Sequence, residues 1–336
     1  MANPLPASPV EIGQREVAEF QRAVVALRTA VSRVIVGQTD VVNAAITTIL
    51  AGGHLLLEGV PGTGKTLLVR TLSRCLDLQF SRIQATPDLM PADVLGTPWV
   101  DERDGRREVR FRPGPVFGNV VLVDEVNRAT PKTQSALLEA MEERQVTVSG
   151  ETHRLPDPFV VLATENPIEM EGTYPLPEAQ LDRFMLKVLV KGASAAEIET
   201  ILDRTTGADV PEASAVLDGP RVLAMQALVR RAILGDRVRA HVAQLVESTR
   251  PEAPGAPPLV RKYVRYGASA RAALSLVLAG KVLALAAGRP QVSRDDVRTL
   301  ARAALRHRLV LNFEGQAEGI TPDAILDEVL AHVGPG

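Results

Sequence analysis

The strongest chemical signal in the sequence is a glycine-rich octapeptide that ends in a lysine and a threonine. It reads Gly59-Val60-Pro61-Gly62-Thr63-Gly64-Lys65-Thr66 and matches the pattern G-x-x-x-x-G-K-[ST]. Glycines let the backbone fold its N–H groups around phosphate oxygens, and the amino terminus of a following helix adds partial positive charge. We therefore predict a site for ATP in which Lys65 reaches the β- and γ-phosphates and the Thr66 hydroxyl coordinates Mg²⁺.

Two more sets of polar groups follow apolar runs further along the chain. Asp124 and Glu125 come directly after Val120–Val123, and Asn166 comes after Phe159–Thr164. An acidic residue at the carboxyl end of a strand faces the ligand crevice of an open α/β sheet. We expect Asp124 to hold Mg²⁺ through water and Glu125 to orient and deprotonate the attacking water. The Asn166 amide could contact the γ-phosphate or that water, although an Asn-Pro dipeptide is equally natural as a plain turn.

These motifs need strands and a helix in a definite order around them. Purely apolar runs predict strands of a parallel sheet covered on both faces, at His54–Leu57, Val120–Val123 and Phe159–Ala163. A helix is expected over Thr66–Cys75, and further helical stretches between the strands indicate an α/β layer architecture. Two alternating segments predict hairpins, either decorative or functional, at Pro98–Arg112 and Gln145–Leu155.

After about Leu189 the chain becomes rich in Ala, Leu and Arg, which predicts a smaller, mostly helical part. Helices are expected over Ala195–Arg204, Pro220–Leu234, Asp236–Ser248, Ser269–Ala287, Ser293–Arg306 and Thr321–Val333. A length of 336 residues fits two domains at about 100–200 residues each. We predict a tail and first helix in residues 1–30, an α/β core in 31–189 and a helical domain in 190–336.

The composition argues against several functional classes. Lys plus Arg is 38 and Asp plus Glu is 40, so the net charge is −2, and aromatic residues are only 3%. Nucleic acid is therefore an unlikely partner, apart from a local basic patch. We expect no membrane span and no signal peptide, and the single cysteine, Cys75, fits a reducing compartment, so we predict a cytoplasmic protein. The five histidines lack ligand spacing, so no metal beyond Mg²⁺ is predicted.

Longer strings of residues surround the catalytic motifs. They run over Asp124–Ala129, Pro131–Met141, Asn166–Glu169 and Glu171–Phe184. With the phosphate-binding octapeptide they closely resemble the MoxR family of AAA+ ATPases, over about residues 30–315. The resemblance implies an AAA+ P-loop fold, in which a parallel sheet flanked by helices is followed by a smaller all-α lid domain, and it implies ATP hydrolysis.

The resemblance also implies roles for residues outside the phosphate loop. Asn166 would be the sensor-1 residue, and Arg183 would be the arginine finger that acts on the ATP of a neighbouring subunit. Arg271 would be the sensor-2 arginine of the lid, and Val36-Gly37-Gln38 would lie near the adenine. Ala270 stands where the family usually has proline, which leaves Arg271 itself unaffected.

The resemblance also implies partners, because members of the MoxR family form rings, usually hexamers, and often work with proteins that carry a von Willebrand factor A domain. The resemblance thus implies that this chain forms a homo-oligomeric ring and remodels or matures client complexes. The two hairpins would be the helix-2 insert and the pre-sensor-1 hairpin of the corresponding AAA+ clade.

From the residues alone, other roles for three arginines and other functions for the protein stay open. Arg183 could pair locally with Glu178 or Asp182, Arg271 could be an ordinary surface arginine, and Arg128 could either sense nucleotide or bridge subunits. A nucleic-acid motor or loader of similar fold would use the arginine cluster on the first hairpin, at Arg103, Arg106, Arg107, Arg110 and Arg112. A metal-chelatase ATPase subunit and a nucleotide-gated scaffold that rarely hydrolyses ATP are the other candidates.

Overall fold

The computed structural model describes residues 12–103, 106–167, 173–207 and 211–334. The amino-terminal tail, the Asp104-Gly105 turn and residues 168–172 of the family strings therefore lie outside the described residues. None of the helices in the described ranges combines the length and the apolar character needed to cross a bilayer.

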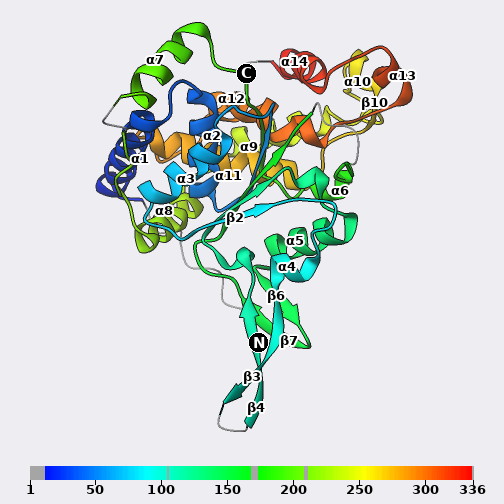
Figure 1. Ribbon diagram of the computed structural model, residues 1–336. Helices are drawn as coiled ribbons and strands as arrows, with labels where there is room; N and C mark the ends of the chain where they lie inside the picture. The colour runs from blue at the N-terminus through cyan, green and yellow to red at the C-terminus, as the bar shows by residue number, and fades with distance from the viewer. Residues whose placement is uncertain (1–11, 104–105, 168–172, 208–210, 335–336) are drawn as a thin grey trace, which may run out of the picture.

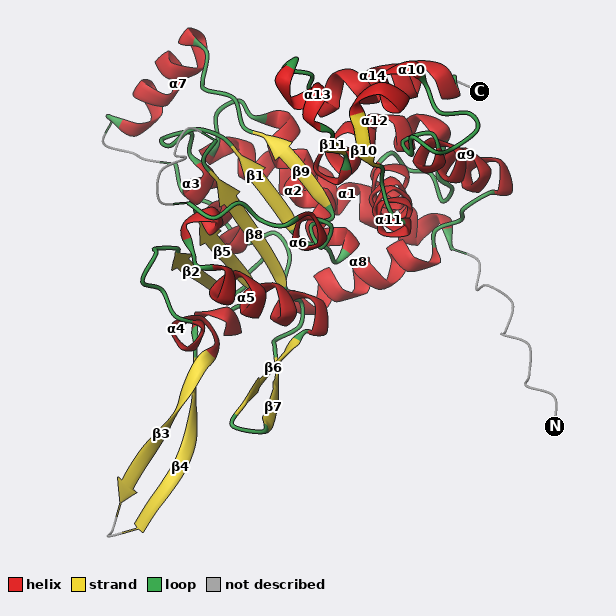
Figure 2. Ribbon diagram, turned by 90° about the vertical axis from the view of Figure 1, so that its right-hand side faces the viewer, coloured by secondary structure: helices red, strands yellow, loops and turns green. Residues whose placement is uncertain are grey.

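A five-stranded parallel sheet lies at the centre of the α/β part (Figure 1), and its strand order, β2-β5-β8-β1-β9, can be followed in Figure 2. Its strands are β1 (Leu55–Glu58), β2 (Phe80–Gln84), β5 (Val120–Asp124), β8 (Val160–Glu165) and β9 (Leu186–Leu189). Glu58 pairs in register with Glu165, and Asp124 with Gln84. Because every strand pair is parallel, the carboxyl ends of all five strands meet at one edge, which we call the carboxyl edge.

Alternate side chains of the strands enter two different cores. Leu55, Leu57 and Leu162 belong to the same apolar cluster as residues of α2 (Thr39–Ala51) and α3 (Lys65–Cys75). Leu56 and Val161 point the other way, into a cluster with α5 (Pro131–Glu143). The central strands are buried on both faces, which explains why their sequences show no polar alternation.

The second part of the chain is mostly helical. It contains α7 (Ala195–Thr205), α8 (Gly219–Arg231), α9 (Asp236–Glu247), α10 (Pro258–Tyr263), α11 (Ala270–Ala286), α12 (Arg294–Leu305), α13 (Phe313–Ala317) and α14 (Pro322–Val333), with the turn η3 (Arg306–Arg308). Two short antiparallel strands, β10 (Val264–Tyr266) and β11 (Val310–Leu311), are its only sheet within the described ranges.

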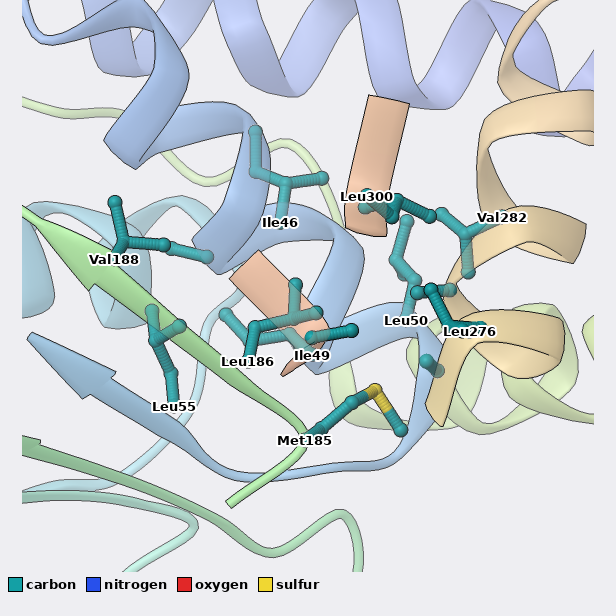
Figure 3. Packing of buried hydrophobic residues seen from close by; sticks show 14 of the residues in the cluster. Ile46, Ile49, Leu50, Leu55, Met185, Leu186, Val188, Leu276, Val282 and Leu300 are labelled. Carbon is teal, nitrogen blue, oxygen red and sulfur yellow. The ribbon is translucent and has the colours of Figure 1, made fainter. Parts of the chain in front are cut away.

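One apolar core is continuous between the two parts (Figure 3). Ile49 and Leu50 of α2 lie together with Leu186 of β9, Leu276 of α11 and Leu300 of α12. The first helix, α1 (Gln14–Val34), also contacts α11 and contributes its own buried face to this cluster. The boundary predicted after residue 30 therefore falls inside a continuous helix, between the two buried residues Ala30 and Val31.

Two hairpins leave the α/β part side by side (Figure 2). The longer one consists of β3 (Gly96–Arg103) and β4 (Arg106–Pro113), after the short helix α4 (Pro91–Leu95), and it extends away from the body of the molecule. The shorter one consists of β6 (Gln145–Val148) and β7 (Glu151–Arg154). The Phe111 ring of β4 stacks on the His153 ring of β7 with centroids 3.9 Å apart, so the two hairpins contact each other near their bases.

Candidate nucleotide-binding site

Residues Gly59–Gly64 of the octapeptide form the loop between β1 and α3, and Lys65 and Thr66 begin α3, so the octapeptide joins a strand to a helix as its sequence predicts. Gly62 and Gly64 have φ angles of +79° and +78°, a backbone region that other residues enter only with strain. The Lys65 ammonium donates to the carbonyls of Gly59 (2.6 Å) and Val60 (2.8 Å). Burial lowers the pKa of Lys65, although Asp124 and Glu125 act in the opposite direction. The lysine is thus held inside the loop, close to where phosphate oxygens would meet the backbone N–H groups.

Asp124 ends β5 directly beside the loop. The Thr66 hydroxyl donates to Asp124 Oδ2 at 3.3 Å, and the Thr164 hydroxyl of β8 donates to Oδ1 at 3.4 Å. A hydroxyl and a buried carboxylate at this spacing are the hard oxygen ligands that suit Mg²⁺. Arg82 of β2 was not predicted, and its Nε donates to the same Oδ2 atom at 2.7 Å.

Glu125 takes an uncommon backbone conformation, with φ at +55°. Its N–H donates to the Thr164 hydroxyl at 2.8 Å, which fixes the turn after β5. Its carboxylate accepts hydrogen bonds of 3.2 Å from Gln84 Nε2 and from Arg128 Nη1. Two neighbouring strands and the following turn, η2 (Val126–Arg128), therefore orient the predicted base. Arg128 thus contacts the predicted base of its own chain, and both roles considered for it, sensing nucleotide and bridging subunits, stay open.

Asn166 follows β8, the strand between β1 and β5, and it is buried. The Gly59 N–H donates to the Glu165 carbonyl at 3.1 Å, so the start of the phosphate loop is bonded to the residue just before Asn166. The structure thus brings Lys65, Thr66 and Asp124, with Glu125 and Asn166, to one place on the carboxyl edge.

Val36, Gly37 and Gln38 lie between α1 and α2, and Gln38 contacts the phosphate loop. Gln38 Nε2 donates to the Thr63 carbonyl at 2.6 Å, and the Glu197 carboxylate of α7 packs directly against Gly37. This position beside the loop is compatible with the predicted contact to adenine, which stays a prediction.

Arg183 and Arg271 do not lie at the carboxyl edge. Arg183 lies just before β9, so it falls at the amino ends of the strands, and Arg271 shares the partner Glu142 with it. The four residues of β1 alone separate the two edges by roughly 13 Å. Arg183 Nε forms an ion pair of 3.0 Å with Glu142 Oε2, and Arg271 Nη2 donates to Glu142 Oε1. Neither arginine therefore reaches the phosphate loop of its own chain. The roles predicted for the two arginines stay predictions. The alternative local partners that the sequence suggests for Arg183, Glu178 and Asp182, are wrong, since Glu142 at the end of α5 is its ion-pair partner.

The two arginines line a cavity of about 260 Å³ between the sheet and α11, together with Gly53 and His54. Arg308 of η3 holds the chain on either side of Arg183: its buried guanidinium donates to the Asp182 carboxylate at 2.6 Å and to the Phe184 carbonyl at 2.9 Å. No sequence motif marks Glu142 or Arg308, since both lie within ordinary charged helical segments.

The basic cluster on the first hairpin is only partly described. Arg110 forms an ion pair with Glu108 at 2.9 Å, while the side chains of Arg103, Arg106 and Arg107 lie outside the described residues. In the described part of the chain no group of three or more His, Cys, Asp or Glu side chains could hold a metal.

Comparison with known proteins agrees with this geometry. The ATPase family associated with various cellular activities (AAA) matches residues 54–186, and the AAA lid domain matches residues 258–329. Chaperone MoxR1 of Mycobacterium tuberculosis is 44% identical over 304 residues, which is 90% of this chain and 80% of that protein. Protein MoxR of Methylorubrum extorquens is 30% identical over 334 residues, which is 93% of this chain and 95% of that protein.

The chain belongs to the MoxR family of AAA+ ATPases. A crystal structure of a candidate ATPase from Cytophaga hutchinsonii superposes with a TM-score of 0.88 and 39% identity, over 95% of this chain and 96% of that one. Both the predicted family and the predicted fold, a parallel sheet flanked by helices with a helical lid, are confirmed. The octapeptide and the acidic pair Asp124-Glu125, which are the predicted ATP-binding and catalytic groups, both lie within the residues that match the AAA family.

Proposed function

We propose that this protein binds ATP with Mg²⁺ at the Gly59–Thr66 loop and hydrolyses it within a ring of identical subunits. The observation that supports this most strongly is the meeting of Lys65, Thr66, Asp124 and Glu125 at one edge of the sheet, which joins two separate sequence motifs. Membership of the MoxR family supports the same chemistry.

Each of the side chains at this site has a separate role in the proposed hydrolysis of ATP. Lys65 exchanges its bonds to the loop carbonyls for bonds to the β- and γ-phosphates, while Thr66 and Asp124 hold Mg²⁺. The metal, when bound, neutralises charge on the phosphate oxygens. Glu125, fixed by Gln84 and Arg128, orients the attacking water and accepts its proton. Asn166 donates to the γ-phosphate or to that water.

A neighbouring subunit completes the site. Arg183 and Arg271 lie at the opposite edge of the sheet from their own loop and share one carboxylate, so a single triphosphate of the adjoining subunit can receive both. An arginine supplied in this way is worth about 10³–10⁵ in kcat. We propose a hexamer, as the family resemblance implies.

The proposed cellular role is remodelling or maturation of protein complexes in the cytoplasm, together with a partner that has a von Willebrand factor A domain. The name of the relative Chaperone MoxR1 supports a chaperone-like role. The β3–β4 hairpin, which extends from the body, would transmit motion to the client (Figure 2).

Phosphate release and ATP binding, measured on the wild type and on Glu125→Gln, test this proposal. The variant should bind ATP and lose about 10²–10⁴ in turnover, because it keeps the shape of the side chain but not the base. Glu143→Gln, at an exposed glutamate of α5, is the matched control and should be unaffected. Normal turnover in Glu125→Gln would remove Glu125 as the base.

The subunit contact has a separate test. Arg183→Ala should bind ATP with little turnover, and mixing it with Glu125→Gln should restore part of the activity, because each variant supplies what the other lacks. A mixture no more active than its components would contradict action across the interface.

A further inference from the structure

Three charged side chains lie together on the sheet outside the groups discussed so far. Lys187 of β9 forms ion pairs with Glu58 at the end of β1 (2.6 Å) and with Glu165 at the end of β8 (3.3 Å). The side chains of Lys187 and Glu165 are each 15% exposed, and that of Glu58 is 27% exposed. We call these three residues the Lys187 triad.

The strand register explains why one lysine can reach both glutamates. Glu58 pairs with Glu165, and Lys187 pairs with Leu56, two residues before Glu58. Because residues two apart on a strand share a face, all three side chains lie on the same face, and the long lysine leans towards the carboxyl edge. β1 lies between β9 and β8, so Lys187 reaches across it.

Each glutamate directly precedes a part of the nucleotide site. Glu58 is followed by Gly59, where the phosphate loop begins, and Glu165 is followed by Asn166. Backbone hydrogen bonds run through the same residues, from Gly59 N to Glu165 O (3.1 Å) and from Val190 N to Glu58 O (2.7 Å). Lys187 thus connects the loop, the strand that carries Asn166 and the strand that leads into the helical part.

The ammonium of Lys187 offsets the repulsion between the Glu58 and Glu165 carboxylates. Burial raises the pKa of Glu165, and Glu58 raises it further, while Lys187 lowers it. Burial lowers the pKa of Lys187, but the two glutamates outweigh burial, so that the net shift is upward. Without the ammonium, two carboxylates on neighbouring strands would face each other in a largely buried site.

The fold itself does not need an ion cluster here. The preceding residues on the same face, Leu56 and Ala163, are fully buried and apolar. Buried ion pairs are weak contributors to stability, because desolvation offsets much of their attraction. A role in placing the adjoining site residues explains the triad better than stability does.

We propose that Lys187 is a positioning residue which, by bridging Glu58 and Glu165, holds the start of the phosphate loop and Asn166 at the separation that ATP hydrolysis needs. This inference rests on the proposed ATPase function. The loop binds phosphate through its own backbone and α3, so loss of the bridge acts on the γ-phosphate step rather than on nucleotide affinity.

The test uses the full-length chain with two double variants, Lys187→Met/Glu165→Gln and Lys187→Met/Glu58→Gln. Each removes the bridge but leaves only one carboxylate, so neither creates the repulsion of Lys187→Met alone. Lys191→Met, at an exposed lysine four residues further on, is the matched control. Thermal unfolding, the Kd of fluorescent ADP, and kcat for ATP are measured on all of them.

Both double variants should keep a Kd within about threefold of the wild type and lose about tenfold or more in kcat, which corresponds to about 1.4 kcal/mol of barrier. A folded double variant with a kcat within about twofold of the wild type would overturn the proposal. Failure of both to fold would also overturn it, since the triad would then serve stability.

Hydrogen–deuterium exchange separates this inference from the proposed function. The backbone bond from Gly59 to Glu165 should protect peptides covering residues 55–64 in the wild type, and both double variants should exchange there about tenfold faster. A wild type without ATP turnover would refute the proposed function. Unchanged exchange in the double variants would refute the positioning role, whatever the turnover.

Discussion

Glu142→Gln should raise ATP turnover at protein concentrations where rings are only partly assembled. Glu142 engages Arg183 with one carboxylate oxygen and Arg271 with the other. If both arginines serve the ATP of a neighbouring subunit, they must leave Glu142 to do so. The substitution keeps the size of the side chain and removes the charge that holds them.

The structure sets the size of this effect. The side chains of Glu142, Arg183 and Arg271 are 36%, 29% and 47% exposed, so solvent screens both ion pairs. Pairs of this kind contribute about 0.5 kcal/mol each, or about 1 kcal/mol together. That free energy corresponds to a change of about fivefold in the equilibrium between held and released arginines.

The assay is phosphate release at saturating Mg²⁺ and ATP over a range of subunit concentrations. Glu142→Gln should exceed the wild type by up to about fivefold at low concentration and approach it at high concentration, while Glu143→Gln should match the wild type throughout. Turnover at or below the wild-type value at every concentration would refute the reasoning, because Glu142 would then position the arginines rather than withhold them.

Two further predictions concern other charged groups. Burial lowers the pKa of His54 from 6.5 to about 4, so neutral His54 stabilises the fold above pH 6.5 and this stability is lost as the pH falls towards 4. Because of His54, chemical denaturation should show a free energy of unfolding that is about 2 kcal/mol lower at pH 5 than at pH 7. His54→Gln should reduce this difference. The same pH dependence of the free energy of unfolding in both proteins would show that His54 is not its cause. Arg82 donates to the oxygen of Asp124 that Thr66 also contacts, so Arg82→Gln should lower the Mg²⁺ concentration for half-maximal turnover by about two- to fivefold, as expected for loss of a partly exposed competing cation. A Mg²⁺ requirement that stays the same or rises in titrations of turnover would show that Arg82 does not compete with the metal.

The central part of the site follows from local sequence. The glycines of Gly59–Thr66 specify the turn of the phosphate loop by themselves, and the apolar runs before Asp124 and Asn166 predict buried strands. The sheet edge where these three segments meet is therefore predictable without a structure. The same pattern does not predict the edge strands β2 and β9. Phe80–Gln84 contains three polar residues among five, and β9 contains Lys187, because edge strands are less completely covered than central ones.

The groups that hold the site together could not be predicted. Arg82 and Gln84 act only because β2 pairs with β5, and Lys187 acts only because β9 pairs with β1. Glu142 meets Arg183 and Arg271 across 41 and 129 positions of sequence. Such contacts depend on tertiary register, which a single sequence does not encode in any local pattern.

The central claim is that triphosphate binds where Lys65 lies, and its most direct measurement is a titration of the protein with a fluorescent ATP analogue in the presence of Mg²⁺. Charge-assisted hydrogen bonds to phosphate contribute about 1.5–3 kcal/mol, so Lys65→Ala should weaken binding by about 10- to 150-fold, with Lys191→Ala unchanged. Equal affinity in Lys65→Ala and the wild type would contradict the account.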